Sequence, residues 1–138
     1  MANLTVTAAN VRPLDGSVSR HYDAGAAGIA PGDAVYVASD GDVEKTDANV
    51  SNAAAAFRGL VVAIQGGKAS TALGDRVTVA VFGPVAGFSG LTPGAPGYVS
   101  NDAGKLEDAA GAFARFAGYA ESDTVFFVSP EQSTAASS

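Results

Sequence analysis

Cysteine is absent from this chain of 138 residues, and several kinds of chemistry are absent with it. No disulfide can form within the chain, no thiol can act as a nucleophile, and no zinc site with thiolate ligands can be built. A chain of this length buries roughly 68% of its unfolded surface, so a hydrophobic core can stabilise it without such links. The sequence predicts one compact domain and is compatible with folding in a reducing cytoplasm.

Basic residues and long apolar runs are also scarce. Eight Lys and Arg stand against fourteen Asp and Glu, which gives a net charge of −6. Phosphates repel such a chain, so no nucleic-acid partner is expected. No apolar run approaches the roughly 20 residues that cross a bilayer, and the first residues lack the basic and apolar regions of a signal peptide. We therefore expect no membrane partner and no export.

The chain has a single histidine, which limits acid-base and nucleophilic catalysis. His21 is near Asp23, with Ser17 and Ser19 just before it. A Ser-His-Asp triad needs three groups that converge from across a fold, and alternating residues of one extended segment do not converge. We interpret His21 as a partly exposed residue of an edge strand or arm, and the sequence predicts a protein that is not an enzyme.

Two further motifs resemble a phosphate-binding loop and a calcium-binding turn, but each lacks residues that such a site requires. Residues 65–71, QGGKAST, resemble a phosphate-binding loop, but Val62 occupies its first glycine position and Ala69 its hydroxyl position. The turn Asp40-Gly41-Asp42 supplies only two carboxylates, too few for the six or more oxygens of a calcium site. The sequence therefore predicts no cofactor and no metal ion.

Glycine is abundant, and it separates short runs of β-branched residues. The chain contains 17 glycines. This pattern is typical of short strands joined by tight turns. The predicted strands are residues 4–7, 34–37, 57–64, 76–82, 97–100 and 124–128.

An internal repeat relates two parts of the chain. IAPGDAVYVASDGDVEK (29–45) resembles LTPGAPGYVSNDAGKLE (91–107), with five identities at one offset. FRGLV then matches FAGYA, and DRVTV matches DTVFF, in the same order. The repeat predicts two related halves, 29–82 and 91–128. The alternative, that a Pro-Gly pattern recurs by chance in a glycine-rich β chain, stays open.

These features predict the fold class and the organisation of the chain. Neither half contains enough apolar residues for a core of its own, so we expect the halves to share one core in a compact all-β barrel or sandwich. Residues 29–130 form this domain. Residues 1–28 are expected to be an N-terminal strand or arm, and the polar residues 131–138 a C-terminal tail or arm.

Three segments resemble small bacteriophage head proteins of the decoration, or cement, type. They read PGDAVYVASDGDV, FRGLVVAI and GDRVTVAVFGPVAG. The resemblance implies a virion structural protein without catalytic residues, made in the host bacterial cytoplasm. It would bind the major capsid protein on the outer surface of the assembled capsid, often as a homotrimer, and stabilise the head.

The arms are the expected contacts with the capsid or with other subunits, because an extended segment can add a strand to a neighbouring sheet. The candidate contact residues are Leu4, Val6, Val11, Tyr22, Glu131 and Gln132.

Two other functions are compatible with the composition. A tail or fibre accessory module could bind a sugar or another virion protein, and it would group exposed aromatic residues on one face. Its candidate stacking residues are Tyr22, Tyr36, Tyr98 and Tyr119. A hydrolase would instead need a cleft with perturbed acids.

Overall fold

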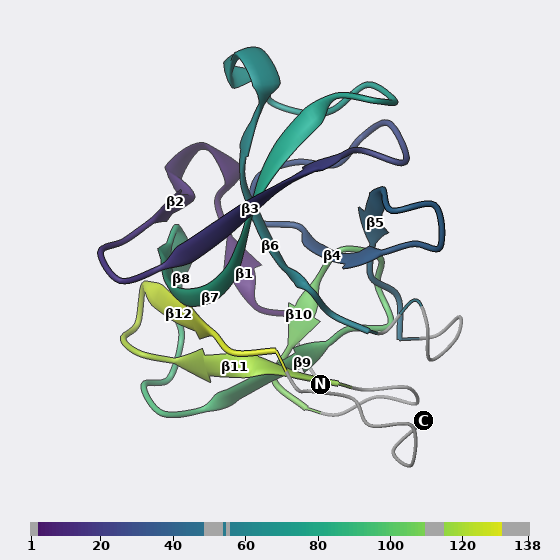
Figure 1. Cartoon of the computed structure of the whole chain (residues 1–138). Helices are drawn as coiled ribbons and strands as arrows, with labels where there is room; N and C mark the ends of the chain where they lie inside the picture. The colour runs from purple at the N-terminus through teal and green to yellow at the C-terminus, as the bar shows by residue number, and fades with distance from the viewer. Residues whose placement is uncertain (1–2, 49–53, 55, 110–114, 131–138) are drawn as a thin grey trace.

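The computed structural model describes residues 3–48, 54, 56–109 and 115–130. Within them the chain is almost entirely β, with a strongly curled, half-barrel sheet, so the predicted all-β class is confirmed (Figure 1). The C-terminal tail, including Glu131 and Gln132, lies outside the described residues.

Twelve strands and two short 3-10 helices make up the described structure. The strands before the second 3-10 helix are β1 (Thr5–Val6), β2 (Arg12–Pro13), β3 (Val18–Asp23), β4 (Ala34–Val37), β5 (Val43–Lys45) and β6 (Gly59–Ile64). Those after it are β7 (Arg76–Ala86), β8 (Phe88–Ser89), β9 (Pro96–Val99), β10 (Leu106–Glu107), β11 (Phe116–Ala120) and β12 (Val125–Val128). The helices span Ala8–Asn10 and Gln65–Gly67.

The main sheet repeats one strand order in its two halves. Its path is β10-β9-β11-β12-β7-β6-β4-β5, and every pairing along it is antiparallel. Read from its outer strand toward the centre of the sheet, the first half runs β5-β4-β6-β7 and the second runs β10-β9-β11-β12. The halves join where β12 pairs with the second part of β7. Corresponding strands come from the two segments that resemble each other in sequence.

Cross-strand pairs also correspond between the halves. Tyr36 is opposite Glu44 in the first hairpin, and Tyr98 is opposite Glu107 in the second. Each Pro-Gly pair forms a turn in which the amide of the fourth residue donates to the carbonyl of the first at 3.0 Å, over 30–33 and 92–95. The glycines of both turns have positive φ, 92° and 85°, which a side chain would disfavour.

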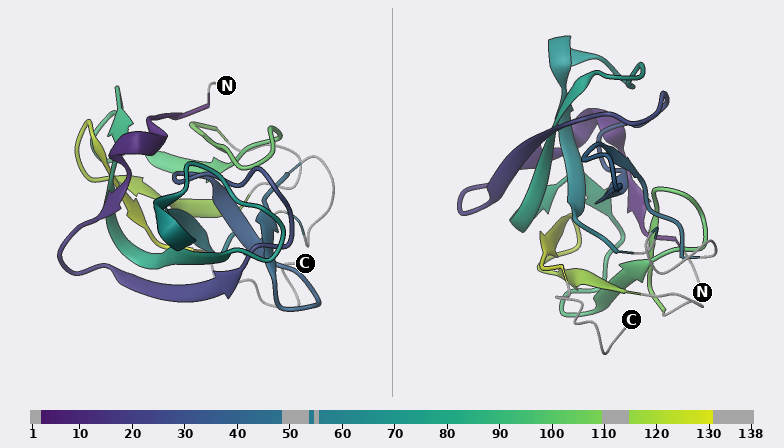
Figure 2. Two further views of the ribbon diagram at one scale, coloured as in Figure 1. Left: turned by 90° about the horizontal axis from the view of Figure 1, so that it is seen from above. Right: turned by 45° about the vertical axis from the view of Figure 1, so that its right-hand side comes forward.

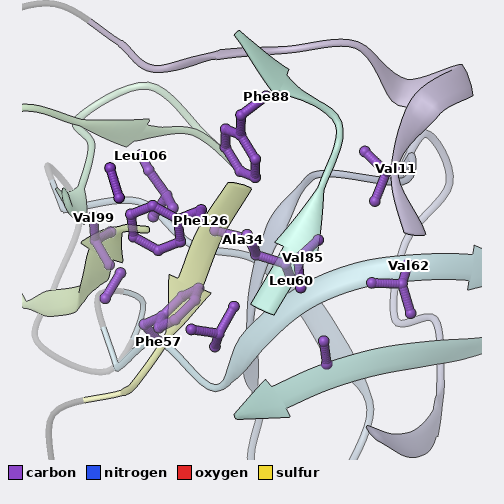
Figure 3. Close-up of a cluster of buried hydrophobic side chains, with 14 of the residues drawn as sticks. Val11, Ala34, Phe57, Leu60, Val62, Val85, Phe88, Val99, Leu106 and Phe126 are labelled. Atoms are coloured by element: carbon purple, nitrogen blue, oxygen red, sulfur yellow. The ribbon is translucent and has the colours of Figure 1, made fainter. Parts of the chain in front are cut away.

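The apolar side chains form two core clusters, of which the larger is shared by the two halves as expected and the smaller was not expected. The larger cluster joins residues from both halves and includes Leu60, Val85, Val99, Leu106 and Phe126 (Figure 3). The smaller cluster is built from the first half and from Ala24 of the N-terminal segment. It consists of Ala24, Ile29, Val35, Val43, Val61, Ile64, Val77 and Val79.

The second cluster exists because the central strands are buried on both faces. In β6, Leu60 and Val62 belong to the larger cluster, whereas Val61 between them belongs to the smaller one. Successive side chains of a strand point to opposite faces, so one apolar strand supplies two cores. The first half therefore buries enough apolar surface for its own cluster.

The N-terminal segment is part of the sheets and does not extend from them as an arm. β1 pairs with β8, while β2 and β3 pair in turn with the long strand β7. In Figure 1 the purple and indigo segments lie against the body of the molecule. Pairing of this kind satisfies backbone groups that an arm would leave to solvent or to a partner.

Candidate functional site

An exposed row of apolar side chains crosses four adjacent strands. Val18 on β3, Phe82 on β7 and Tyr119 on β11 are 51%, 47% and 38% exposed, and Phe127 on β12 is half-buried between them. We call these four residues the aromatic face. Large apolar side chains that group on a surface are typical of an interaction site, whereas single ones need no explanation.

Ring contacts hold the aromatic face together. The Phe127 ring stacks on Tyr119, with ring centroids 5.1 Å apart, and meets the Phe82 ring edge to face at the same separation. Val18 is directly opposite Phe82 in the ladder between β3 and β7. Such contacts fix the side chains, so a partner would meet a preformed apolar surface.

Strand alternation explains why these rings point outward. In β12, Phe126 and Val128 are fully buried in the larger cluster, so Phe127 between them lies on the other face. Sequence reasoning missed the face. The alternation of β7 gave no signal for Phe82, because Ala80 has the same parity and is buried in the larger cluster, and a register shift against β3 separates the two residues.

The hairpin turns that contain Asp40 and Asp102 are held in different ways. In the first, the Asp42 amide donates to Asp40 Oδ1 at 3.0 Å, an arrangement local to the turn. In the second, Asn3 Nδ2 donates to Asp102 Oδ2 at 2.7 Å, and Ser100 Oγ donates to Asn3 Oδ1 at 2.7 Å. The N-terminal segment therefore fastens the second hairpin.

Two acidic side chains are buried, and burial is the main cause of a raised pKa for both. Glu107 is 4% exposed, its Oε1 has no hydrogen-bond partner among the described residues, and the nearby charges of Asp108 and Asp102 raise its pKa further. The pKa of Asp33 is also raised, although it accepts the Ala30 amide at 2.8 Å and its Oδ2 lies 3.7 Å from Lys45 Nζ. The two groups lie on different elements and form no joint acidic site.

One open groove of about 520 Å³ lies beside the first 3-10 helix. Its lining is mostly apolar and includes Ala8, Val11 and Val62. The one charged side chain in the lining is Lys68, whose Nζ lies 2.8 Å from Asp75 Oδ2. This lining offers no acid-base pair to a substrate.

His21 does not form a relay with Asp23. Its Nδ1 lies 3.2 Å from Thr78 Oγ1, while Asp23 Oδ1 lies 3.2 Å from Arg76 Nη1. Both contacts are cross-strand pairs between β3 and β7 at the exposed surface. Over the described ranges, no group of three or more His, Asp or Glu side chains is placed to hold a metal ion.

The predicted contact residues that the structure describes are engaged inside the chain. Leu4 and Val6 pack against the larger core cluster, and Val11, 9% exposed, is a member of it. Tyr22 packs against the smaller cluster, and its hydroxyl accepts a hydrogen bond from Arg58 Nε at 2.9 Å. The alternating apolar residues of the segment thus serve the chain's own cores, and a contact of these residues with a capsid or a second subunit stays a prediction.

Comparisons with known proteins add no relative. No protein-family model matches the chain, and a search of the curated proteins finds no match. In the part of the chain that the structure describes, no helix has the length and apolar character needed to cross a membrane.

Proposed function

We propose that this protein is a bacteriophage capsid decoration protein, which binds the outer surface of an assembled capsid and stabilises it without catalysis. The observation that carries the proposal is the aromatic face, a preformed apolar surface on an acidic chain. In this proposal the aromatic face, and not a terminal arm, contacts the major capsid protein.

The chemistry of the aromatic face favours a protein partner. Val18, Phe82 and Phe127 carry no polar group, and Tyr119 supplies one hydroxyl. Burying such side chains gives the apolar centre that a protein interface needs. Many identical contacts over a capsid shell act together, so a modest affinity for each copy suffices.

The experiment measures co-sedimentation with capsids assembled without this protein, and the heat resistance of filled particles. We expect the wild type to sediment with capsids and Phe82→Ser to lose most of that binding. The matched control is Leu73→Ser, which removes an apolar side chain that is 73% exposed on a separate loop. The proposal fails if the wild type does not sediment with capsids, or if particles without it resist heat equally well.

A tail or fibre module that binds a sugar is the second candidate, and one specific observation favours it. Exposed aromatic rings do group on one face, as such a module requires, and Tyr119 is the ring best placed to stack on a sugar because it is exposed and carries a hydroxyl. Tyr36 and Tyr98 are at corresponding hairpin positions and are not among the four residues of the aromatic face. Retention on immobilised polysaccharide that Tyr119→Ala abolishes, without capsid binding, would establish this alternative.

A further inference from the structure

The open groove beside the first 3-10 helix lies at the margin of the larger core cluster. Val11 and Val62 line the groove and are buried members of that cluster. Ala8 and Ala63 also line it and are exposed. In the left view of Figure 2 the two 3-10 helices, purple and teal, lie on the same side of the molecule. The groove can therefore bury apolar side chains of a bound segment against the edge of the core.

Lys68 is the one charged residue that lines this groove. Its Nζ lies 2.8 Å from Asp75 Oδ2, and its side chain is 49% exposed. Asp75 Oδ2 also accepts a hydrogen bond from the Ala72 amide at 2.8 Å, which holds the carboxylate in place. A lysine ammonium has three N–H donors, and the contact with Asp75 uses one of them. Asp75 therefore fixes the position of the Lys68 ammonium and leaves donors for an anionic group.

A backbone donor is adjacent to this lysine in the chain. Ala69 lines the groove as well, and among the described residues its amide has no hydrogen-bond partner. A carboxylate has two oxygens that accept from several donors, and its hydrogen bonds to charged donors are the stronger ones. A ligand with one carboxylate and an apolar body therefore suits the groove.

The C-terminal end of a polypeptide and a fatty acid both combine a carboxylate with an apolar body, and the shape of the groove favours the polypeptide. The groove is open and holds about 520 Å³, so one side of its occupant faces water. A peptide backbone presents polar groups to that water, whereas an alkyl chain would leave apolar surface exposed. Capture of a C-terminal carboxylate by backbone amides is a recurring mode of peptide recognition.

We propose that this groove binds the C-terminal end of a partner polypeptide whose last residues are apolar. The terminal carboxylate accepts hydrogen bonds from Lys68 Nζ and from the Ala69 amide, and the apolar side chains pack on Val11 and Val62. None of the four residues of the aromatic face lines the groove, so this is a separate contact surface. The proposal does not rest on the capsid proposal, because different residues carry it and the free protein tests it.

Titration of the free protein with short peptides tests the role of the carboxylate. The probe is acetyl-Ala-Val-Val-Leu with a free C-terminus, and its matched control is the same peptide with a C-terminal amide. We expect the free acid to shift the backbone amide NMR signals of Ala63 and Ala69 and to bind about tenfold more tightly than the amide. Equal affinities for the two peptides, or no shift at Ala69 with either, would refute the proposal. Sodium octanoate that binds more tightly than the free acid would also refute it, and would identify a fatty-acid site.

A change at Lys68 tests the cation that the proposal names. Lys68→Met keeps an apolar stem and removes the ammonium, so it should lose the preference for the free acid and bind both peptides alike. Lys105→Met is the matched control, because Lys105 is an exposed lysine outside the groove. A Lys68→Met variant that keeps the wild-type preference, or a Lys105→Met variant that loses it, would overturn the assignment.

Filling the groove tests its place in binding. Ala63 is exposed on β6, so Ala63→Phe should unfold near the wild-type temperature while its ring occupies the groove. We expect this variant to bind neither peptide. An Ala63→Phe variant that unfolds with the wild type and still prefers the free acid would show that the peptide binds elsewhere.

Discussion

Gly59 and Gly118 stand in the same relationship to a carbonyl on the neighbouring strand. A Cβ at Gly59 would overlap the carbonyl oxygen of Ala80, and a Cβ at Gly118 would overlap that of Phe127. The two glycines also correspond in pairing, since Gly59 is opposite Val35 and Gly118 is opposite Gly97. In each half of the sheet, neighbouring strands therefore come so close at this glycine that no side chain fits there.

Replacing either of these glycines with alanine should destabilise the fold. The obstacle is backbone, which cannot rotate away, so we expect a cost of about 3 kcal/mol at each position. Gly118 should cost more, because its φ of 148° is also unfavourable for a side chain. Urea unfolding measures both. Gly16→Ala is the control, since its φ is also positive but nothing lies within 4 Å of the added Cβ. Costs no larger than the control would contradict the close approach.

The carboxylate of Asp33 in the first Pro-Gly turn has no equivalent in the second, where the corresponding residue is Ala95. Asp33→Ala should cost about 1 kcal/mol, because the Ala30 amide loses its acceptor. Asp33→Asn retains an acceptor oxygen and removes a buried charge, so it should be close to neutral at pH 7. Chemical unfolding of the two variants in parallel checks this, and equal losses would contradict the role assigned to the hydrogen bond.

Because of Glu107, the fold should be more stable at acidic pH than at neutral pH, over the pH range in which this carboxyl group titrates. Its folded pKa is raised, chiefly by burial, so the folded state binds a proton more tightly than the unfolded state. The contribution of this group is thus fully present below the unfolded pKa, near 4.5, and is lost as pH rises through the higher folded pKa. Glu107→Gln should therefore stabilise the protein at neutral pH, by about 1 kcal/mol.

Thermal unfolding across pH tests the Glu107 prediction. The difference between Glu107→Gln and wild type should shrink as pH falls toward the unfolded pKa. Glu44→Gln is the matched control, because Glu44 is opposite Tyr36 as Glu107 is opposite Tyr98, but its side chain is only half-buried. A Glu107→Gln variant that is less stable than wild type at neutral pH would show that the carboxylate has a favourable partner.

Asp75 should contribute to stability with the opposite dependence on pH. The hydrogen bond from Lys68 is the first cause of its lowered pKa, so the stabilisation is present above the unfolded pKa and is lost as pH falls through the folded one. Lys68→Met should reduce this acid sensitivity, with the remainder due to the hydrogen bond that the Ala72 amide donates to Asp75, and leave the Glu107 effect unchanged. The pH dependence of the unfolding midpoint distinguishes the two groups, and an unchanged acid limb would contradict the Asp75 assignment.

Much of the sheet could be predicted because its strands carry local signals. The run Ala34–Val37 forms β4 with the predicted bounds, and β7 begins at Arg76 as expected. Strand β3 could not be recognised in the same way. Its sequence VSRHYD is polar and mostly exposed, and what holds it is the edge of β7, a partner far along the chain.

The aromatic face shows a second limit of reasoning from sequence. Phe82, Tyr119 and Phe127 are far apart in the chain, and each alone could be a core residue. Only the order of the strands brings them side by side. The same limit made the alternating Leu4 and Val6 resemble an exposed arm, when the strand order places them over the core.

The N-terminal segment should therefore be required for stability. Leu4 Cδ1 lies 3.3 Å from where a Cβ at Gly97 would stand, and Val6 Cγ2 lies 2.8 Å from the equivalent point at Gly32. The segment thus contacts both halves of the sheet. Deleting residues 2–10 removes both side chains and β1, and should cost about 3 kcal/mol. Thermal unfolding measures this, with Thr5→Ala as a control at an exposed position between them.

The stability of the variant that lacks residues 2–10 determines what a loss of its capsid binding would mean. If the deleted chain is as stable as the full chain, the segment is a separate arm and its loss tests docking directly. If the chain is destabilised, as we expect, any loss of binding reflects unfolding of the sheet. Phe82→Ser avoids this ambiguity because Phe82 is 47% exposed and belongs to neither core cluster. A Phe82→Ser variant that unfolds at the wild-type temperature and fails to sediment with capsids would locate the binding surface on the aromatic face.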